Sequence, residues 1–174
     1  KGHTETIKVG DPLDEDTQMG AQVSEEQFTK VLGYIEGGRE AGARVVTGGK
    51  RATERGYFVE PTIFDGVTGD MAIAREEIFG PVAYLAPFKD ENDGLTMAND
   101  TPYGLANSVW SSDLDRCRRV ASQFEAGNGW INSHNVVVHS VPYGGIKQSG
   151  MGGGVGSLET LLDYYRGISV IRPL

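Results

Sequence analysis

The sequence has little cysteine, no long apolar run and a deficit of positive charge. Its 174 residues include one cysteine, Cys117, so no internal disulfide can form, which favours a reducing compartment. No apolar run approaches the roughly 20 residues of a membrane helix, and the first residues lack an apolar signal core. The 24 acidic residues outnumber the 16 basic ones, and a net charge of -8 disfavours binding to nucleic acid or anionic membranes. We therefore expect a cytoplasmic globular protein that binds neither.

Several catalytic signatures are missing as well. The sequence has no G-x-G-x-x-G run, no phosphate-binding loop, no H-E-x-x-H or paired C-x-x-C, and no G-x-S-x-G. Three neighbouring arginines would lower the pKa of Cys117 if it were a nucleophile. Its position on an apolar face at helical spacing instead favours a small core residue. His134 and His139 leave a general base open, but surface histidines are the better interpretation.

Glycine is abundant, with 25 residues, and many of these should set turns. Between them, helical spacing of apolar residues alternates with short extended runs, which predicts an α/β sheet with helices on its faces. The expected helices begin at the Ser24–Gln27 capping box, at Asp90, at Asp113 and at about Leu158. Gly37-Gly38 is expected to fray or end the first of them. The expected extended segments are 44–47, 57–64, 81–86, 105–110, 129–132 and 168–171. The long loop 133–156 indicates a functional segment.

The segment from Glu76 to Val82, E-E-I-F-G-P-V, is the most specific candidate site. A carboxylate at a strand end can accept two hydrogen bonds from a vicinal diol, such as that of a ribose. Phe79, two residues after Glu77, would lie on the same side of an extended chain and could pack against a flat ring. Taken alone, the residues favour a simpler interpretation. The glutamates would form an ion pair with Arg75 at the surface, and Phe79 would be buried in the core.

This segment resembles a signature of the NAD(P)-dependent aldehyde dehydrogenase superfamily. Other segments resemble further signatures of that family in the same order, from about residue 7 to the end of the chain. The similarity to betaine and other nonspecific aldehyde dehydrogenases is the strongest. These segments are Gly10-Asp11-Pro12 with Gly20, 56–62 (G-Y-F-x-x-P-T), 99–106 (N-x-T-x-Y-G-L-A), 130–132 (W-I-N) and 142–150 (P-Y-G-G-x-K-x-S-G). An ordered set of this size is far more specific than any single motif.

The resemblance implies an α/β fold, a three-layer sheet with flanking helices. Residues 1–166 would be the C-terminal portion of the catalytic domain and 167–174 an oligomerisation strand, with the dinucleotide-binding domain absent from this chain. The parent protein would oxidise a small-molecule aldehyde to a carboxylic acid with NAD or NADP, as a homodimer or homotetramer. The family's nucleophilic cysteine, glutamate general base and oxyanion-hole asparagine precede this region, and Cys117 does not match that cysteine. We therefore expect the isolated chain to be inactive.

The resemblance also assigns roles to individual residues. Glu77 would hold the nicotinamide ribose, and Phe79 would lie beside the nicotinamide. The backbone carbonyls of Lys147 and Gly150 would hold a monovalent cation such as K⁺. The wall of the aldehyde tunnel would include Asn135, Val137 and Tyr143.

The chain departs from the family pattern at three places. Gly152-Gly153-Gly154 stands where G-R-E is usual, so Gly154 replaces a glutamate that supports proton relay in related enzymes. Asn128-Gly129 replaces a threonine–valine pair, and Tyr143 replaces the usual phenylalanine. Because no nucleophile is evident, an alternative hypothesis is a non-enzymatic assembly module that pairs with another chain through the strand 168–171.

Overall fold

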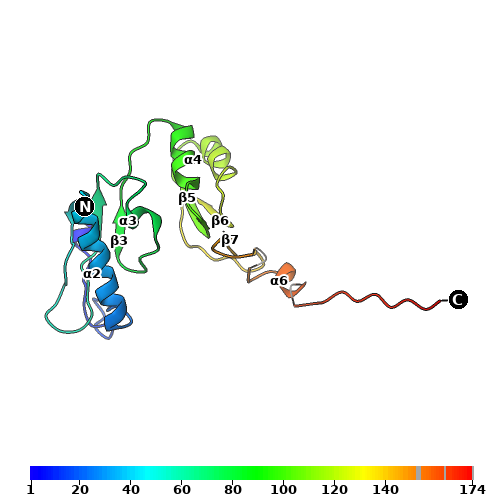
Figure 1. The fold of residues 1–174 in the computed structure, drawn as a ribbon, viewed down its shortest axis with the longest axis horizontal. Coiled ribbons are helices and arrows are strands. Elements are labelled where there is room, and N and C mark those ends of the chain that lie inside the picture. Colours follow the sequence, from blue (N-terminus) through cyan, green and yellow to red (C-terminus); the bar gives the residue numbers. More distant parts are fainter. Residues whose placement is uncertain (152–153, 163, 174) are drawn as a thin grey trace. The chain divides into compact units, whose positions relative to one another are not determined.

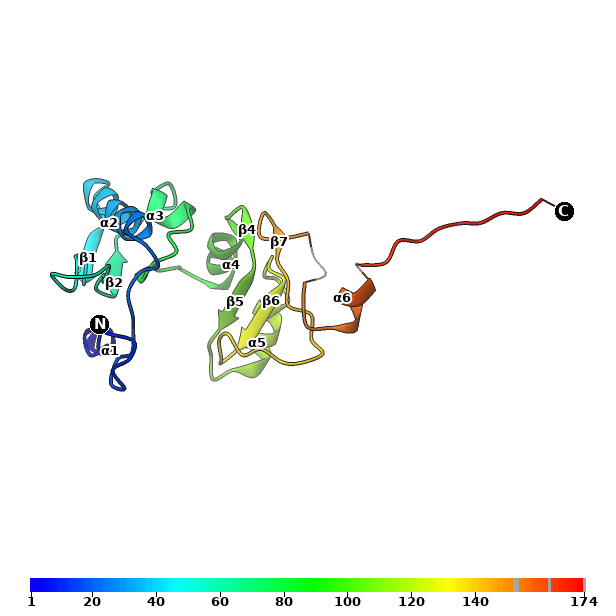
Figure 2. The same ribbon diagram turned by 90° about the horizontal axis from the view of Figure 1, so that it is seen from below.

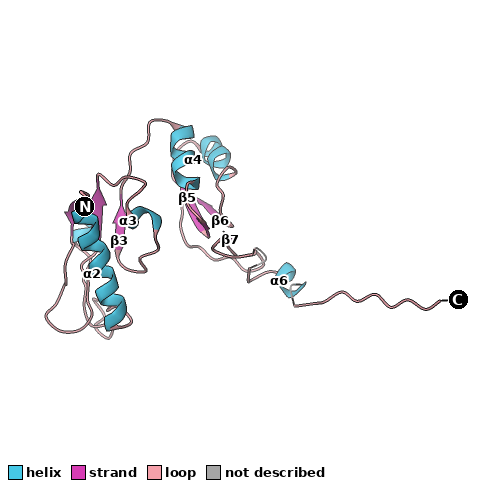
Figure 3. Cartoon of the chain, viewed as in Figure 1, coloured by secondary structure: helices cyan, strands magenta, loops and turns pink. Residues whose placement is uncertain are grey.

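The computed structural model describes residues 1–151, 154–162 and 164–173. Its contacts divide the chain into two compact units, unit 1 over residues 1–87 and unit 2 over residues 88–174. Each unit combines helices with short strands (Figure 3), which confirms the predicted mixed α/β class. The strands of the described residues form three small sheets. None of the described helices has both the length and the apolar character needed to cross a membrane.

Unit 1 is built around one long helix and a three-stranded sheet (Figure 1). The sheet has the order β1-β2-β3, with β1 and β2 antiparallel and β2 and β3 parallel. The elements are α1 (Gly2–Glu5), α2 (Glu25–Glu40), β1 (Arg44–Thr47), β2 (Thr62–Asp65), α3 (Ala72–Arg75) and β3 (Val82–Tyr84). One face of α2 packs on this sheet and on α3. The buried core residues are Phe28, Val31, Ile35, Ala43, Val59, Phe64, Ile73 and Ile78.

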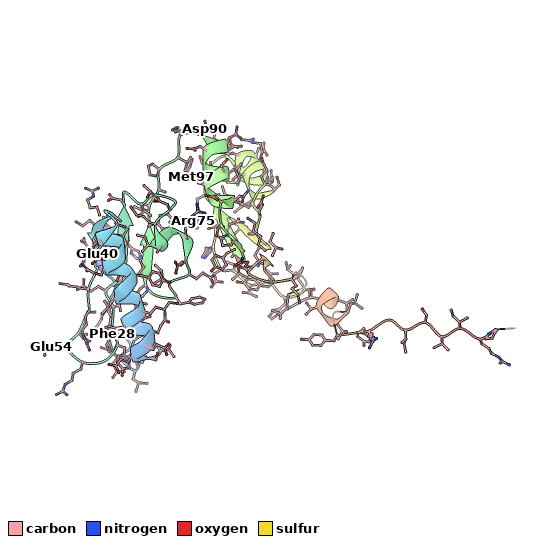
Figure 4. All side chains as sticks on the ribbon, viewed as in Figure 1. Phe28, Glu40, Glu54, Arg75, Asp90 and Met97 are labelled. Atoms are coloured by element: carbon pink, nitrogen blue, oxygen red, sulfur yellow. The ribbon has the colours of Figure 1, made fainter. Side chains whose placement is uncertain are left out.

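Helix α2 begins as predicted but continues further. The Ser24 hydroxyl accepts a hydrogen bond from the Gln27 backbone N–H at 3.1 Å, which satisfies one of the free donors of the first turn. Gly37-Gly38, expected to fray or end the helix, does not end it, because the helix runs on to Glu40, labelled in Figure 4. A Cβ on Gly38 would lie 3.0 Å from the Ile73 side chain. The glycine thus allows α3 to pack closely against α2.

Unit 2 contains two pairs of strands and three helices, seen from a second direction in Figure 2. Strands β5 and β6 are parallel, strands β4 and β7 are antiparallel, and α5 packs against β5 and β6. The elements are α4 (Glu91–Asn99), β4 (Tyr103–Gly104), β5 (Ala106–Val109), α5 (Leu114–Ala121), β6 (Asn128–Ile131), β7 (Ile146–Lys147) and α6 (Leu158–Leu162). The side chains of Asp90 and Asp113 cap α4 and α5, at the predicted helix starts.

The end of the chain differs from the expected strand. Residues 168–171 form no strand within the part of the chain that the structure describes. Ile168, Val170 and Ile171 are 83–90% exposed. A strand needs a neighbour to accept and donate its backbone hydrogen bonds, and the described residues of this single chain offer none here. Helix α6 begins at residue 158, as predicted, and is described over Leu158–Leu162, while residue 163 lies outside the described residues.

Candidate functional site

The turn formed by residues 76–80, between α3 and β3, holds the strongest candidate site of unit 1. Ile78 is buried in the core, whereas the Phe79 side chain is 73% exposed. The interpretation of Phe79 as a core residue is therefore wrong. Its φ of +53° is unusual for a bulky residue, and such strained positions cluster at functional sites. This backbone turns the Phe79 ring away from the core, while Ile78 anchors the turn.

Helix α2 holds this turn at two points. The Gln27 side-chain amide donates hydrogen bonds to the backbone carbonyls of Ile78 and Phe79, at 2.8 Å and 2.9 Å. Gly80 brings the turn against the helix, since a Cβ there would lie 2.5 Å from Val31. The sequence identified Gln27 only as part of a capping box. A glutamate would serve that box equally well. The presence of glutamine in its place was therefore the one signal in the sequence for these two hydrogen bonds.

The two adjacent carboxylates of the turn differ in their surroundings. Tyr34 donates a hydrogen bond from its hydroxyl to Glu76 at 2.6 Å. Glu77 is exposed, and no other described residue forms a hydrogen bond or an ion pair with its carboxylate. Glu76 therefore helps to hold the turn on α2, while Glu77 keeps both oxygens free to accept hydrogen bonds.

In unit 2, the long loop forms a cavity of about 270 Å³ with strand β6. The cavity brings together two of the three predicted tunnel residues, Val137 and Tyr143. The third, Asn135, is exposed at a positive φ of +55° and does not line it. The lining is mainly apolar and consists of Gly127, Asn128, Gly129, Trp130, Val136, Val137, Val138, Val141, Pro142 and Tyr143.

Tyr143 is fixed through its backbone. Its N–H and C=O pair with those of Val155, at 2.8 Å and 2.9 Å. Gly154, which stands where the family has a glutamate, has a φ of +77°, and a Cβ on it would lie 2.2 Å from the Tyr143 carbonyl oxygen. This backbone therefore has no room for the usual glutamate. Gly152 and Gly153 lie outside the described residues.

Lys147 joins three segments of unit 2. Its ammonium group donates to the carbonyls of Asn99 and Thr101, at 2.9 Å and 3.2 Å, and lies 2.6 Å from the Glu125 carboxylate. The side chain is thus committed to the frame of unit 2, and only backbone carbonyls of Lys147 and Gly150 remain for a cation. The described residues contain no group of three or more His, Cys, Asp or Glu able to hold a metal ion.

The remaining candidates of the sequence have structural roles. Cys117 is fully buried, with its thiol 3.7 Å from the Ser111 carbonyl, which confirms the core interpretation. His134 and His139 are exposed, as expected for surface histidines, and His134 meets the Trp130 ring edge-on at 5.3 Å. Cys117 therefore belongs to the core of unit 2, and both histidines lie at its surface.

Comparisons with known proteins cover nearly all of the chain. Residues 1–170 match the model of the aldehyde dehydrogenase family. An aldehyde dehydrogenase of Emericella nidulans is 46% identical over 99% of this chain and 34% of its own length. A betaine aldehyde dehydrogenase of Brucella anthropi is 51% identical over 86% of this chain and 31% of its own length.

Solved structures give the same result. An aldehyde dehydrogenase of Bacillus cereus in complex with NAD⁺ is 44% identical, with a TM-score of 0.87 over 91% of this chain and 32% of that one. A betaine aldehyde dehydrogenase of Staphylococcus aureus in complex with NAD⁺ is 37% identical, with a TM-score of 0.89 over 94% of this chain and 33% of that one. The chain spans about a third of the length of these relatives. The predicted resemblance is confirmed, and the chain belongs to the aldehyde dehydrogenase family.

Proposed function

We propose that this chain is part of a longer NAD(P)-dependent aldehyde dehydrogenase that oxidises an aldehyde to a carboxylic acid. The observation that carries the proposal is the 76–80 turn, where an unengaged Glu77 carboxylate stands beside an exposed Phe79 ring on a strained backbone. Two of the similar structures are NAD⁺ complexes, which supports NAD as the cofactor. NAD or NADP, when bound, would accept the hydride from the substrate.

Two residues of the turn would contact the cofactor in this proposal. The Glu77 carboxylate would accept hydrogen bonds from the two hydroxyls of the nicotinamide ribose, and a charged acceptor strengthens such bonds. Phe79 would lie against the nicotinamide ring. The strain at Phe79 is compatible with this role because Gln27, Ile78 and Gly80 hold the turn before any ligand arrives.

The cavity of unit 2 would receive the aldehyde. Val137 and the Tyr143 ring supply an apolar wall, and Asn135, exposed next to the lining residue Val136, would offer a polar contact. We assign no nucleophile within this chain, because the thiol of Cys117 is buried beneath its helix and cannot meet an aldehyde carbon. The nucleophile and the dinucleotide-binding domain would then belong to another part of the protein.

The test compares the 174-residue chain with the protein in full length. We expect NADH formation with an aldehyde only from the full-length protein, and no tight NAD binding by the chain in isothermal titration, since a few ribose contacts cannot offset the cost of association. Micromolar NAD binding by the chain would show that it holds the cofactor without the rest of the protein, and turnover that the substitution Cys117→Ser abolishes would make Cys117 the nucleophile.

We also propose a K⁺ ion held by the backbone carbonyls of Lys147 and Gly150. Oxygen ligands suit such a hard cation, and Lys147 already directs its ammonium group elsewhere. Exchanging KCl for choline chloride at constant ionic strength should then lower the melting temperature of the full-length enzyme. Equal melting temperatures in both salts would remove the cation from the proposal.

Assembly as a homodimer or homotetramer is the second part of the proposal. The segment 168–171 exposes Ile168, Val170 and Ile171, which is typical of an edge that pairs with another chain. If this were the only function, the chain would be an assembly module and not an enzyme. Light scattering should show an oligomer that becomes a monomer on deletion of residues 168–174, and a monodisperse monomer before deletion would argue against this pairing.

A further inference from the structure

Two side chains of one strand hold the loop that lines the cavity of unit 2. Asn128 and Trp130 of β6 are two residues apart, so they leave the same face of the strand. The Trp130 indole N–H donates to the Val136 carbonyl at 2.9 Å, and the Asn128 amide donates to the Gly144 carbonyl at 3.0 Å. These two carbonyls enclose the segment 137–143, which supplies half of the residues that line the cavity.

The Asn128 amide also reaches a second segment. It donates to the Leu105 carbonyl at 2.8 Å, and the Asn128 backbone N–H donates to the same oxygen at 3.1 Å. Both acceptors of the amide are therefore carbonyl oxygens, and only a side chain with two N–H donors can satisfy both. Gly127 makes this reach possible, because a Cβ there would lie 1.9 Å from the Gly144 carbonyl oxygen.

We infer that Asn128 is a positioning residue that sets aldehyde specificity by fixing Gly144, and with it the adjacent Tyr143 wall, to strand β6. The inference rests on the proposed function. In the sequence, Asn128 attracted notice only as a departure from the family pattern. The structure indicates a role for this departure, because the asparagine amide donates to two carbonyls, whereas a threonine hydroxyl has one hydrogen to donate.

The test is the substitution Asn128→Asp in the full-length enzyme. It keeps the size of the side chain and replaces two donors by oxygens that face carbonyl oxygens. We expect KM for aldehydes to rise about tenfold and the ranking of small against bulky aldehydes to change, with KM for NAD unchanged. Asn128→Thr keeps one donor, so its KM for aldehydes should lie between those of the wild-type and the Asn128→Asp enzymes. The matched control is Asn92→Asp, at an exposed position of α4, which should leave both constants unchanged.

Equal changes in the two KM values, or none in either, would overturn the inference. A second readout is independent of activity. Amide hydrogen exchange in residues 136–144 should be faster in the Asn128→Asp protein than in the Asn92→Asp protein, while residues 25–40 stay unchanged. Unaltered exchange in 136–144 would also overturn it. A wild-type enzyme with no aldehyde-dependent NADH formation would refute the proposed function, and the exchange result would then decide the positioning role by itself.

Discussion

The 76–80 turn of unit 1 and the 133–143 loop of unit 2 are held by the same chemical device. In each, a side-chain amide donates to two backbone carbonyls. Gln27 grips two consecutive residues, Ile78 and Phe79, whereas Asn128 joins two carbonyls from distant parts of the chain. The first amide locks a short turn locally, and the second fastens the long loop 133–156 at Gly144, directly after the segment 133–143.

The difference would suit the two ligands proposed for these regions. A cofactor is the same in every turnover, so a short turn with a buried anchor and one strained residue can be set in advance. Aldehydes vary, and a long loop held by a few side-chain hydrogen bonds can change its wall without disturbing the core. We therefore expect substitutions in the turn to affect cofactor use and substitutions in the loop to affect the choice of aldehyde.

The largest effect should come from Glu77→Gln in the full-length enzyme. Hydrogen bonds to a charged acceptor contribute about 1.5–3 kcal/mol, which corresponds to roughly a tenfold to hundredfold loss in cofactor binding or hydride transfer. Glu76→Gln is the matched control, because Tyr34 already occupies that carboxylate and a smaller effect follows. Steady-state kinetics on both variants decides the point, and equally small effects would make Glu77 an ordinary surface residue.

Gln27→Glu tests whether the hydrogen bonds from α2 to the turn matter for cofactor binding. Glutamate is equally suited to the first turn of α2, so the substitution leaves the helix start intact. It removes the two donors that hold Ile78 and Phe79 and places a carboxylate oxygen against their carbonyl oxygens. KM for NAD should rise about tenfold, and the ranking of aldehydes should stay the same. Glu26→Gln, at an exposed neighbouring position, serves as the control. A changed aldehyde ranking would contradict the division of roles between the two regions.

Tyr143→Phe should have a weaker effect, confined to substrate choice. The ring stays in the cavity near Trp130, whose centroid is 6.4 Å away, and only the hydroxyl is lost. Polar aldehydes should lose a few-fold in kcat/KM relative to apolar ones, since one neutral hydrogen bond contributes about 1 kcal/mol. A panel of aldehydes measured with both proteins checks this. An unchanged ranking would remove Tyr143 from the specificity wall.

The sequence predicted the elements better than their contacts. Turn chemistry and apolar spacing located the starts of α2, α4 and α5, because caps and periodicity are local properties. The continuation of α2 through Gly38 was missed, since it depends on Ile73, which is remote in the sequence. The motif around Glu77 and Phe79 was found, but not its support by Gln27, which depends on tertiary hydrogen bonds.

The two units also contain comparable ion pairs at their surfaces. In unit 1, the Arg44 guanidinium donates to Asp65 across β1 and β2 and holds the pKa of that carboxyl below its ordinary value of 3.8. In unit 2, Arg119 donates two hydrogen bonds of 2.8 Å to Glu91, which tie α5 to α4 and lower the pKa of Glu91 from 4.5. Both carboxylates are therefore more acidic in the folded chain than in the unfolded one.

The smallest predicted effect is a pH dependence that separates the two units. A depressed folded pKa stabilises the fold at pH values above the unfolded pKa, and this stabilisation is lost as the pH falls through the folded value. Glu91→Gln should therefore lower the melting temperature slightly at about pH 7, and this difference should shrink as the pH falls through the folded pKa of Glu91. Trp110 and Trp130 both belong to unit 2, so tryptophan fluorescence of the 174-residue chain reports the melting of that unit. Asp65→Asn should leave this signal unchanged, and a shift of equal size would show that the two units unfold together.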